Sequence, residues 1–175
     1  MNKKGAISRI GSDAPWEPIF GYSRAVRAGD WIAVSGTTSF DGSGQIVGYG
    51  QMYVQARQAI ANLTAALERA GATLGDVVRT RVFATDLTRF AEIARAHRES
   101  FGATPPASTA VEVRRLVHPD MLVEIEADAY APASAKDASP DPPRPVVRRA
   151  KPKIATSKVR NSKARSPARK SRPGR

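Results

Sequence analysis

The sequence has 175 residues, enough for one domain of ordinary size together with an appendage. Its 28 Lys and Arg against 16 Asp and Glu give a formal net charge of +12, and this excess lies entirely in residues 133–175, which hold 14 Lys and Arg and 2 Asp. The absence of cysteine excludes disulfides, zinc–thiolate centres and cysteine nucleophiles. No stretch approaches the roughly 18 apolar residues of a membrane helix and no apolar run follows Lys3 and Lys4, so we expect a cytoplasmic protein with no membrane partner.

The beginning of the chain has the pattern of an antiparallel meander. Short strands are predicted over residues 5–10, 22–26 and 31–35. Gly29 suits a tight turn between the last two strands. Pro15 and Pro18 predict that the segment after the first strand has no regular structure. Residues 40–50 contain four glycines and no periodicity, which predicts a loop.

Two amphipathic helices follow. The first is predicted over residues 51–70, with Gly71 in the position of a left-handed C-terminal cap. Its apolar stripe consists of Met52, Ala56, Ile60, Leu63, Leu67 and Ala70. The second helix is predicted over residues 88–101, with Asp86 or Thr88 as its N-cap and Gly102 as its end. Its stripe consists of Phe90, Ile93, His97 and Phe101.

A strand over residues 77–84 lies between the helices in the sequence. Its alternation predicts that Val78, Val82 and Ala84 face one way and that Arg79, Arg81 and Phe83 face the other. Six strands and two helices therefore make up an α+β domain. Because two helices with one stripe each can cover only one face of a mixed sheet, the second face must meet solvent or another subunit.

Residues 105–129 close the domain and read as a hairpin of two alternating strands. Glu124 and Glu126 lie on the polar face of its second strand, opposite Val123 and Ile125. For an isolated antiparallel pair, a solvated face is the simpler explanation of these carboxylates. The uncovered second face of the sheet, which also carries Leu122 and Ala110 by alternation, instead favours a subunit contact that encloses a polar cleft.

Residues 133–175 differ in composition from the domain of residues 1–132. This tail is rich in Lys, Arg, Pro, Ala and Ser and has no aromatic residue, so we predict that it is disordered. Dispersed basic residues are typical of arms that bind nucleic acid or other polyanions without reading sequence. A solubility tail explains the same composition equally well.

Common catalytic and metal-binding motifs are absent from the sequence. His97 and His118 form no recognisable metal motif, and there is no GxSxG elbow, P-loop or dinucleotide fingerprint. We therefore expect no metal and no standard hydrolase, kinase or dehydrogenase.

Several segments are nevertheless similar to one known family. They are GYSRAV (residues 21–26), VSG (34–36), QARQAIANLTAALERAGATLGDVVRTRVFATDL (55–87), PAST (106–109), VEVRRL (111–116) and VEIEADA (123–129). Over residues 7–129 the chain resembles the Rid/YjgF family of reactive-intermediate (enamine/imine) deaminases, formerly labelled L-PSP endoribonucleases. The resemblance implies a chorismate-mutase-like α+β fold with a mixed six-stranded sheet, two helices on one face, and a homotrimer with intersubunit clefts. It also implies hydrolysis of a small-molecule enamine or imine to a 2-oxo acid and ammonia, without a cofactor.

The resemblance assigns roles to individual residues. Tyr22 matches the tyrosine of the family's cleft, Ser35 and Gly36 match the strand at the pocket floor, and Glu124 matches the glutamate proposed to activate water. Ser108 departs from the pattern, because deaminating members have an arginine there that pairs with the substrate carboxylate. Losing that bidentate contact costs about 2–5 kcal/mol in a desolvated site, so altered substrate choice is implied.

Two other arginines are candidates for the missing role. Arg24 shares a face with Tyr22 on a regular strand, and Arg81 points away from the helices. A salt bridge at the rim is the simpler explanation of Arg24, and a charge in a trimer contact is the simpler explanation of Arg81. The expected activity is enamine or imine deamination with a changed substrate, and the alternatives are a small-molecule-binding trimer without deaminase activity and an RNA-directed protein that uses the basic tail.

Overall fold

The structure is a computed structural model that describes residues 7–12 and 14–132. The predictions that residues 133–175 form a disordered tail separate from the domain, and that this tail binds polyanions, lie outside the described residues. Among the residues that are described, no helix is long and apolar enough to cross a membrane.

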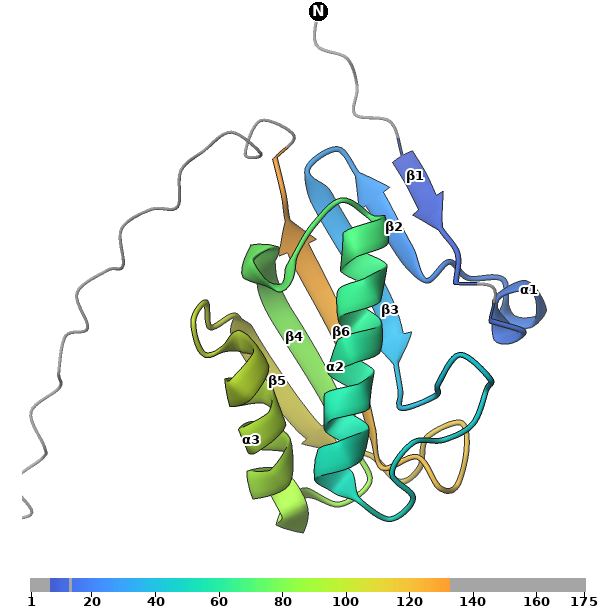
Figure 1. Ribbon diagram of the computed structural model, residues 1–175, viewed down its shortest axis with the longest axis vertical. Helices are drawn as coiled ribbons and strands as arrows, with labels where there is room; N and C mark the ends of the chain where they lie inside the picture. Colours follow the sequence, from blue (N-terminus) through green and yellow to red (C-terminus); the bar gives the residue numbers. More distant parts are fainter. Residues whose placement is uncertain (1–6, 13, 133–175) are drawn as a thin grey trace, which may run out of the picture. The chain divides into compact units, whose positions relative to one another are not determined.

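The molecule has one mixed sheet of six strands with two long helices packed on one face (Figure 1). The strands are β1 (Ile7–Ile10), β2 (Ala25–Ala28), β3 (Trp31–Thr37), β4 (Val77–Ala84), β5 (Ala107–Glu112) and β6 (Val123–Tyr130). The helices on the sheet are α2 (Met52–Arg69) and α3 (Phe90–Phe101). The strand order is β1-β2-β3-β6-β4-β5, with β4 and β5 parallel and every other pair antiparallel. The predicted α+β class, with two helices on one face of a mixed six-stranded sheet, is confirmed.

The predicted hairpin of residues 105–129 is wrong. The last strand, β6, does not pair with β5 but inserts between β3 and β4. Val34 of β3 pairs with Ala127, and Val82 of β4 pairs with Ile125. Strand β5 instead pairs in parallel with β4 at the edge of the sheet. Alternation along each strand is a local signal, whereas the choice of partner depends on tertiary packing, which the alternation does not specify.

The proline-containing segment after β1 also differs from the prediction. It contains a short helix, α1 (Trp16–Phe20), that ends at Gly21 with a positive φ of 75°. Pro15 lies at the N-cap and Pro18 in the first turn, where the missing N–H groups have no helical partner to lose. Two prolines in one turn are therefore compatible with a helix.

Helix α2 forms the centre of the core, as its periodicity predicts. The six residues of its predicted stripe are all at most 6% exposed. Gly71 has a φ of 79°, which agrees with the predicted left-handed cap. In α3, Ile93 and Phe101 are buried as expected, while Phe90 is 50% exposed. Asp86 accepts a hydrogen bond from Thr88 N, although it caps the short 3₁₀ turn η2 (Leu87–Arg89) that precedes α3.

A register shift in β4 changes one predicted face. Val77 pairs with Ala129 and Arg79 pairs with Asp128, so one extra residue lies between them in β4. As a result Val77 is buried and Val78 is 42% exposed, which contradicts the expectation that Val78 faces the helices. The rest of the strand follows the prediction, with Val82 and Ala84 buried.

The faces of β5 are the reverse of those expected. Ser108 pairs with Thr80, and Ala110 pairs with Val82, and both partners in β4 are buried beneath the helices. Ser108 and Ala110 therefore face α3, and Thr109 lies on the open side. Leu122 was also expected on the open face, but it packs against the hydrophobic core.

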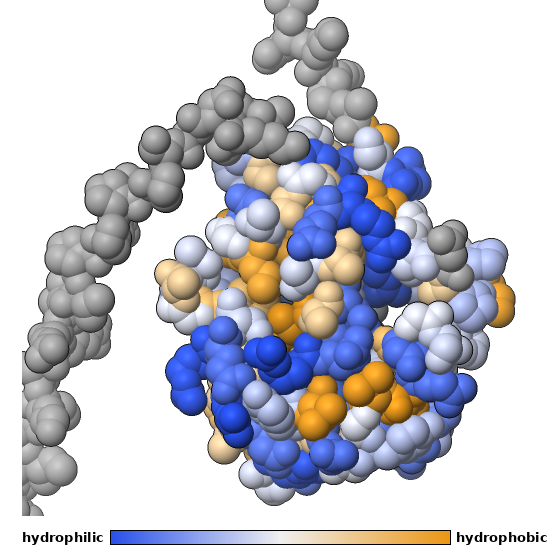
Figure 2. Space-filling model, in the orientation of Figure 1, coloured by the Kyte–Doolittle hydropathy of each residue, from blue (hydrophilic) through white to orange (hydrophobic). Residues whose placement is uncertain are grey.

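The two faces of the sheet have different surroundings. The helix side presents a mainly hydrophilic surface with separate small apolar patches (Figure 2). No helix of the described residues covers the other side, where Trp31 packs edge to face on Tyr130 with 5.4 Å between ring centroids. We call this uncovered side the open face, and it carries the acidic residues of β6.

Candidate functional site

Glu124 and Gly36 meet on the open face because β3 is irregular there. The pairing of β3 with β6 shifts between Val34 and Thr37, which places Gly36 against the Glu124 side chain. A β-carbon at position 36 would overlap Glu124 Oε1 and lie 2.8 Å from its Cδ. Glycine is therefore required for the Glu124 carboxylate to lie across the backbone of β3.

The Glu124 carboxyl group has an unusual electrostatic environment. Burial is the main cause that raises its pKa above the ordinary value of 4.5, and the neighbouring Glu126 adds to the effect. The Arg24 guanidinium acts in the opposite direction. Within the described residues the carboxylate makes no hydrogen bond. Such a group binds a proton more readily than an exposed glutamate and is suited to proton transfer.

Arg24 makes hydrogen bonds to Tyr22 and to the strand beside the Glu124 carboxylate. Its Nη2 donates to Tyr22 Oη at 2.6 Å, and its Nη1 donates to Gly36 O at 2.7 Å and to Thr37 Oγ1 at 3.0 Å. The guanidinium carbon also lies 5.2 Å from the centroid of the Tyr22 ring. The planar fork of arginine thus fixes the Tyr22 hydroxyl relative to the backbone beside Glu124.

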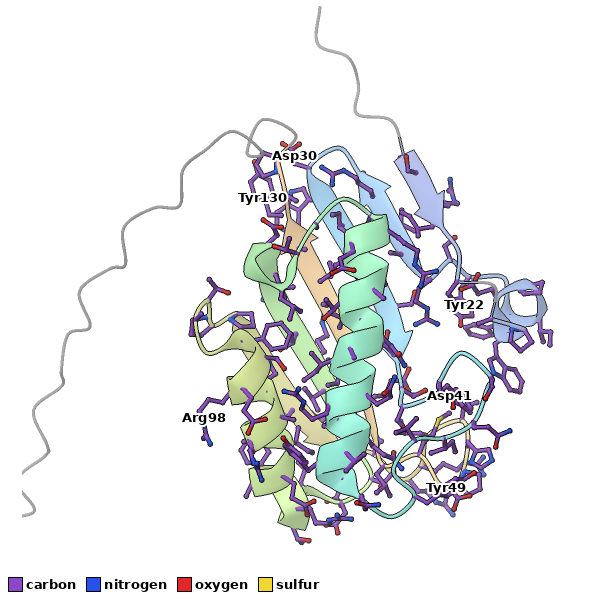
Figure 3. All side chains as sticks on the ribbon, in the orientation of Figure 1. Tyr22, Asp30, Asp41, Tyr49, Arg98 and Tyr130 are labelled. Carbon is purple, nitrogen blue, oxygen red and sulfur yellow. The ribbon has the colours of Figure 1, made fainter. Side chains whose placement is uncertain are left out.

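The local backbone differs from the prediction that residues 22–26 form a strand. Strand β2 begins at Ala25, so Tyr22 and Arg24 lie in the segment between α1 and β2 (Figure 3). Their side chains meet even though no regular strand places them on one face. Ser35 holds this segment to β3, because its N–H donates to Arg24 O at 3.0 Å and its Oγ donates to Ser23 O at 2.8 Å.

Arg81 lies on the open face, as predicted, and is already paired within its own chain. It contacts Glu126 at 3.4 Å and Asp128 at 3.0 Å. Its guanidinium therefore pairs with two carboxylates of β6. Glu124, the third acidic side chain of that strand, has no ion pair among the described residues.

Ser108 is not brought together with Glu124 within one chain. Thr80, its partner in β4, is three residues from Phe83, the partner of Glu124, so the two side chains lie on opposite faces of the sheet. Thr80 Oγ1 donates to Ser108 Oγ at 2.9 Å and lies 3.0 Å from His97 Nε2.

Thr80 and His97 are the residues that sequence reasoning missed. His97 was expected only as a side chain at the core edge, where it does lie, with its ring centroid 4.5 Å from that of Phe101. Burial lowers the pKa of the His97 imidazole below its ordinary value of 6.5. The available signal was Thr80 itself, a hydroxyl residue at a fully buried strand position, since such groups require a polar partner.

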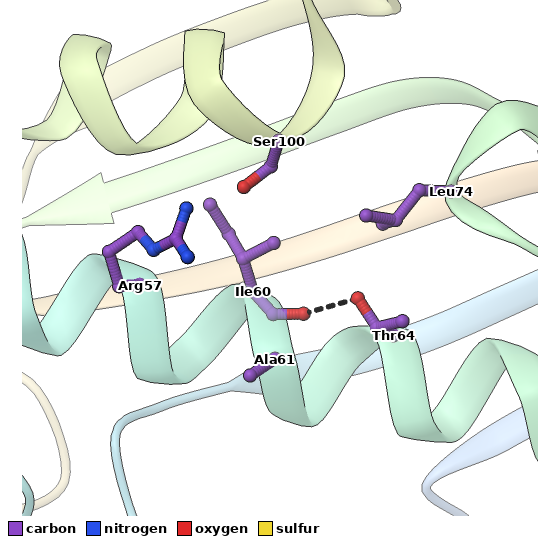
Figure 4. A pocket seen from close by; sticks show the side chains of 6 residues that line it. All are labelled: Arg57, Ile60, Ala61, Thr64, Leu74 and Ser100. Atoms are coloured by element: carbon purple, nitrogen blue, oxygen red, sulfur yellow. Dashed lines mark hydrogen bonds between the residues drawn. The ribbon is translucent and has the colours of Figure 1, made fainter.

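Two cavities formed by the described residues on the helix side bear on the site. One of about 270 Å³ lies between α3 and β5 and contains Ser108 and His97 in its wall. The other, of about 300 Å³, lies between α2 and α3, where Ile60, Leu74 and Ser100 contribute to the wall (Figure 4). The Thr64 hydroxyl in that second cavity donates to Ile60 O and so satisfies the backbone of its own helix. Across residues 7–12 and 14–132, no three His, Asp or Glu side chains gather closely enough to hold a metal ion.

The order and pairing of the six strands and the two helices on one face are those of a YjgF-type α+β domain. A crystal structure of a YjgF-family protein from Mycobacterium tuberculosis is similar, with a TM-score of 0.65 and 42% identity over 72% of this chain and 100% of that one. Escherichia coli TdcF with bound serine is also similar, with a TM-score of 0.60 and 32% identity over 70% of this chain and 92% of that one.

Sequence comparison identifies the family. A RutC family protein of Pyrococcus abyssi is 44% identical over 115 residues, which cover 65% of this chain and 89% of the relative. An uncharacterised protein of Streptomyces coelicolor is 36% identical over 125 residues, covering 71% and 92% of the two chains. The family described as Endoribonuclease L-PSP matches residues 12–131, and the chain belongs to this family, which is the Rid/YjgF family. The expected family and its chorismate-mutase-like fold are confirmed.

Proposed function

We propose that this protein hydrolyses a reactive enamine or imine to a carbonyl compound and ammonia, without a cofactor. The observation that carries the proposal is the Glu124 carboxylate, which is partly buried, makes no hydrogen bond within the described residues and has a raised pKa. The Arg24 guanidinium, whose charge acts on the pKa of Glu124, donates to the Tyr22 hydroxyl and to the carbonyl oxygen of Gly36, the residue against which the Glu124 carboxylate lies. One base and one hydroxyl donor are what hydrolysis of an imine requires, since the imine carbon is already electrophilic.

Each residue then has a defined role in a balanced reaction. Glu124 accepts one proton from water while the water oxygen bonds to the imine carbon, and it passes this proton to the nitrogen, which gives a carbinolamine. Glu124 then takes the proton of the new hydroxyl group and passes it to the nitrogen as the carbon–nitrogen bond breaks, so that ammonia leaves and a carbonyl group remains. Tyr22 stabilises the departing nitrogen, and Arg24 acts as a positioning residue that holds the Tyr22 hydroxyl and opposes the rise in the pKa of Glu124.

The substrate of this proposed reaction differs from that of arginine-containing relatives. Ser108 provides no charge for a substrate carboxylate. Arg24 donates to Tyr22, Gly36 and Thr37, and Arg81 is paired with two carboxylates, so both candidate replacements are already engaged. The Escherichia coli relative holds serine, which supports a ligand of that size for this fold. Within the described part of the chain, neither of these two arginines is available to bind a substrate carboxylate in place of the family's arginine.

The proposed catalytic unit is a cleft between subunits of a homotrimer. Glu124 lies on the open face and Ser108 lies on the helix side, so the two can line one cleft only if they come from different subunits. The open face has no cover of its own among the described elements, which supports the same arrangement.

The proposal is tested by generating imines in the assay and following the release of ammonia and carbonyl product, with an amino-acid oxidase or a threonine dehydratase for imines that carry a carboxylate and a flavin amine oxidase for imines that lack one. We expect Glu124→Gln to lower the rate by about 100-fold or more, in line with the usual contribution of general acid–base catalysis. Glu68→Gln, which changes an exposed glutamate of α2, serves as the matched control. Equal rates for the wild type and Glu124→Gln would contradict the role of Glu124 as the base.

Two alternatives rest on other features. A small-molecule-binding protein of the same fold, without deaminase activity, is favoured by Ser108 and by its separation from Glu124. It predicts ligand binding without turnover on any imine. An RNA-directed activity rests on the family description and on the basic residues 133–175, which lie outside the described part of the chain. Salt-sensitive RNA retention that disappears when residues 133–175 are removed would support it.

A further inference from the structure

One buried glutamine links three segments of the chain. Gln55 lies near the start of α2 and is fully buried, although its side chain ends in a polar amide. Its Nε2 donates to Gly48 O at 3.1 Å and to Asp120 O at 2.8 Å, and its Oε1 accepts from Leu122 N at 2.8 Å. A primary amide has two N–H donors and one acceptor oxygen. Both donors and the oxygen of Gln55 are therefore in use, which fixes the side chain in one orientation.

The linked segments lead to the two residues that meet at the candidate site. Gly48 belongs to the loop that follows β3, the strand that contains Gly36. Asp120 and Leu122 lie directly before β6, the strand that contains Glu124. One side chain of α2 therefore connects the chain after Gly36 with the chain before Glu124.

Regular strand pairing does not by itself fix the distance between these two residues. The pairing of β3 with β6 is irregular around Gly36, and its last pair joins Thr37 to Ile125. In the described sheet, Val123 and Glu124 are paired with residues of β4 and have no partner in β3. The start of β6 is thus held by a strand on one side only.

Leu122 shows how Gln55 supplements the pairing at the start of β6. The carbonyl oxygen of Leu122 accepts from Thr85 N at 3.0 Å, just beyond the end of β4. Its N–H donates to Gln55 Oε1 rather than to a strand. Both polar backbone groups of Leu122 are thereby bonded two residues before Glu124. Without the amide of Gln55 the Leu122 N–H would lose its acceptor, which favours a shift of this segment toward water.

We infer that Gln55 is a positioning residue for Glu124, because it holds the start of β6 so that the Glu124 carboxylate lies against Gly36. Gln55 acts through the backbone of residues 120–122 and makes its hydrogen bonds there and to Gly48. The inference rests on the proposed function in one respect, namely that Glu124 is the base. A misplacement of about 1 Å can lower the rate of a catalysed reaction by about 100-fold, so a residue that does not reach the reacting atoms can still be required.

The position of Glu124 can be measured without turnover. Burial is the main cause that raises the pKa of Glu124, so a carboxyl group that moves from β3 into water should have a pKa closer to its ordinary value of 4.5. NMR titration of this carboxyl group in the full-length protein follows the change. Gln55→Met keeps a similar side-chain volume without the amide and should lower the pKa of Glu124. All samples contain trimethylamine N-oxide, which favours the folded state.

Two further variants separate positioning from a general loss of stability. Gln55→Glu keeps an oxygen that accepts from Leu122 N, and any charge on the new carboxyl group would also raise the pKa of Glu124, so this pKa should stay raised. Gln58→Met changes a partly buried glutamine of the same helix, whose amide donates to Asn62, and should leave the pKa of Glu124 as in the wild type. An unchanged pKa of Glu124 in Gln55→Met would overturn the inference, as would an equal fall in Gln58→Met.

Imine turnover by the same variants distinguishes the inference from the proposed function. If both hold, Gln55→Met should lower kcat by up to about 100-fold with little change in KM, since it displaces the base and leaves the other site residues in place. A lower pKa of Glu124 with unchanged turnover would support the positioning role and overturn the assignment of Glu124 as the base. A lower kcat with an unchanged pKa of Glu124 would overturn the positioning role.

Discussion

Gly36 and Glu124 are coupled because one side chain occupies the space in which the other residue would have a β-carbon. Residue 36 contributes no chemical group, yet it determines whether the carboxylate can lie across β3. A sequence position without a side chain can therefore be as specific for a site as the acid itself.

Gly36→Ala tests this coupling. The added methyl group would overlap the end of the flexible Glu124 side chain, which must then turn away from β3, so we expect the pKa of Glu124 to move back toward its ordinary value of 4.5 with a loss of no more than about 1 kcal/mol in the free energy of unfolding. NMR titration of the Glu124 carboxyl group measures the change in pKa. Gly42→Ala is the matched control, because a β-carbon there meets nothing within 4 Å, and it should leave the pKa of Glu124 unchanged. Equal effects of the two substitutions would contradict the assigned contact.

Glu124 also predicts a pH dependence of stability. Since burial and Glu126 raise its pKa in the folded state, folding takes up a proton between the ordinary pKa of 4.5 and the raised value, and the free energy of unfolding falls as the pH rises through this window. Glu124→Gln removes the ionisation. The variant should therefore be more stable than the wild type at neutral pH, with a difference that vanishes below the ordinary value of 4.5.

Urea titrations of both proteins at pH 4 and pH 7 measure this difference. Glu68→Gln supplies the comparison with an exposed glutamate and should show no such trend. A wild type that gains stability relative to Glu124→Gln as the pH rises would show that the ionised carboxylate is stabilised in the fold.

At the scale of the elements, periodicity predicted helices and strands well and predicted strand partners poorly. The stripe of α2 could be read directly, because one helix face meets the core throughout its length. The extra residue beside Val78 and the reversed faces of β5 could not be predicted from periodicity. A bulge shifts every following side chain by one position, and the alternation along an edge strand is weak.

The residues of the candidate site were likewise predicted only in part. Motif resemblance suggested Tyr22, Gly36 and Glu124, which the fold does gather around Arg24. It also placed Ser108 with them, whereas the parallel pairing of β4 and β5 turns that hydroxyl toward Thr80 and His97. Nothing in the spacing of residues 105–129 specifies a parallel neighbour.

Leu63 offers a test of the helix layer. It is fully buried on α2, so Leu63→Ala should leave a cavity under the helix and lower the free energy of unfolding by about 2–5 kcal/mol. Thermal and denaturant unfolding both measure this loss. Glu68→Ala on the exposed side of the same helix should change stability by no more than about 0.5 kcal/mol. A small effect at Leu63 would mean that α2 is not the centre of the core.

At the scale of the whole molecule, the open face is the main surface to explain. It carries Trp31, which is 55% exposed, and Tyr130, which is 43% exposed, beside the acidic side chains of β6. If the proposed homotrimer buries this face, Trp31→Ser should lower the mass measured by light scattering at micromolar concentration. Glu68→Ser, on the other side of the sheet, should leave it unchanged. A wild-type mass equal to one chain would contradict the intersubunit cleft.

The position of β6 has a consequence for how the protein is made. This strand is the last of the six in the sequence and yet lies between β3 and β4. While the chain is being synthesised, everything up to residue 122 can form only a three-stranded meander and a separate pair of parallel strands, each with an exposed edge. Both of these edges, on β3 and β4, are closed only when residues 123–130 pair with them, so a folding intermediate that lacks β6 exposes two unpaired strand edges of the kind that promotes aggregation.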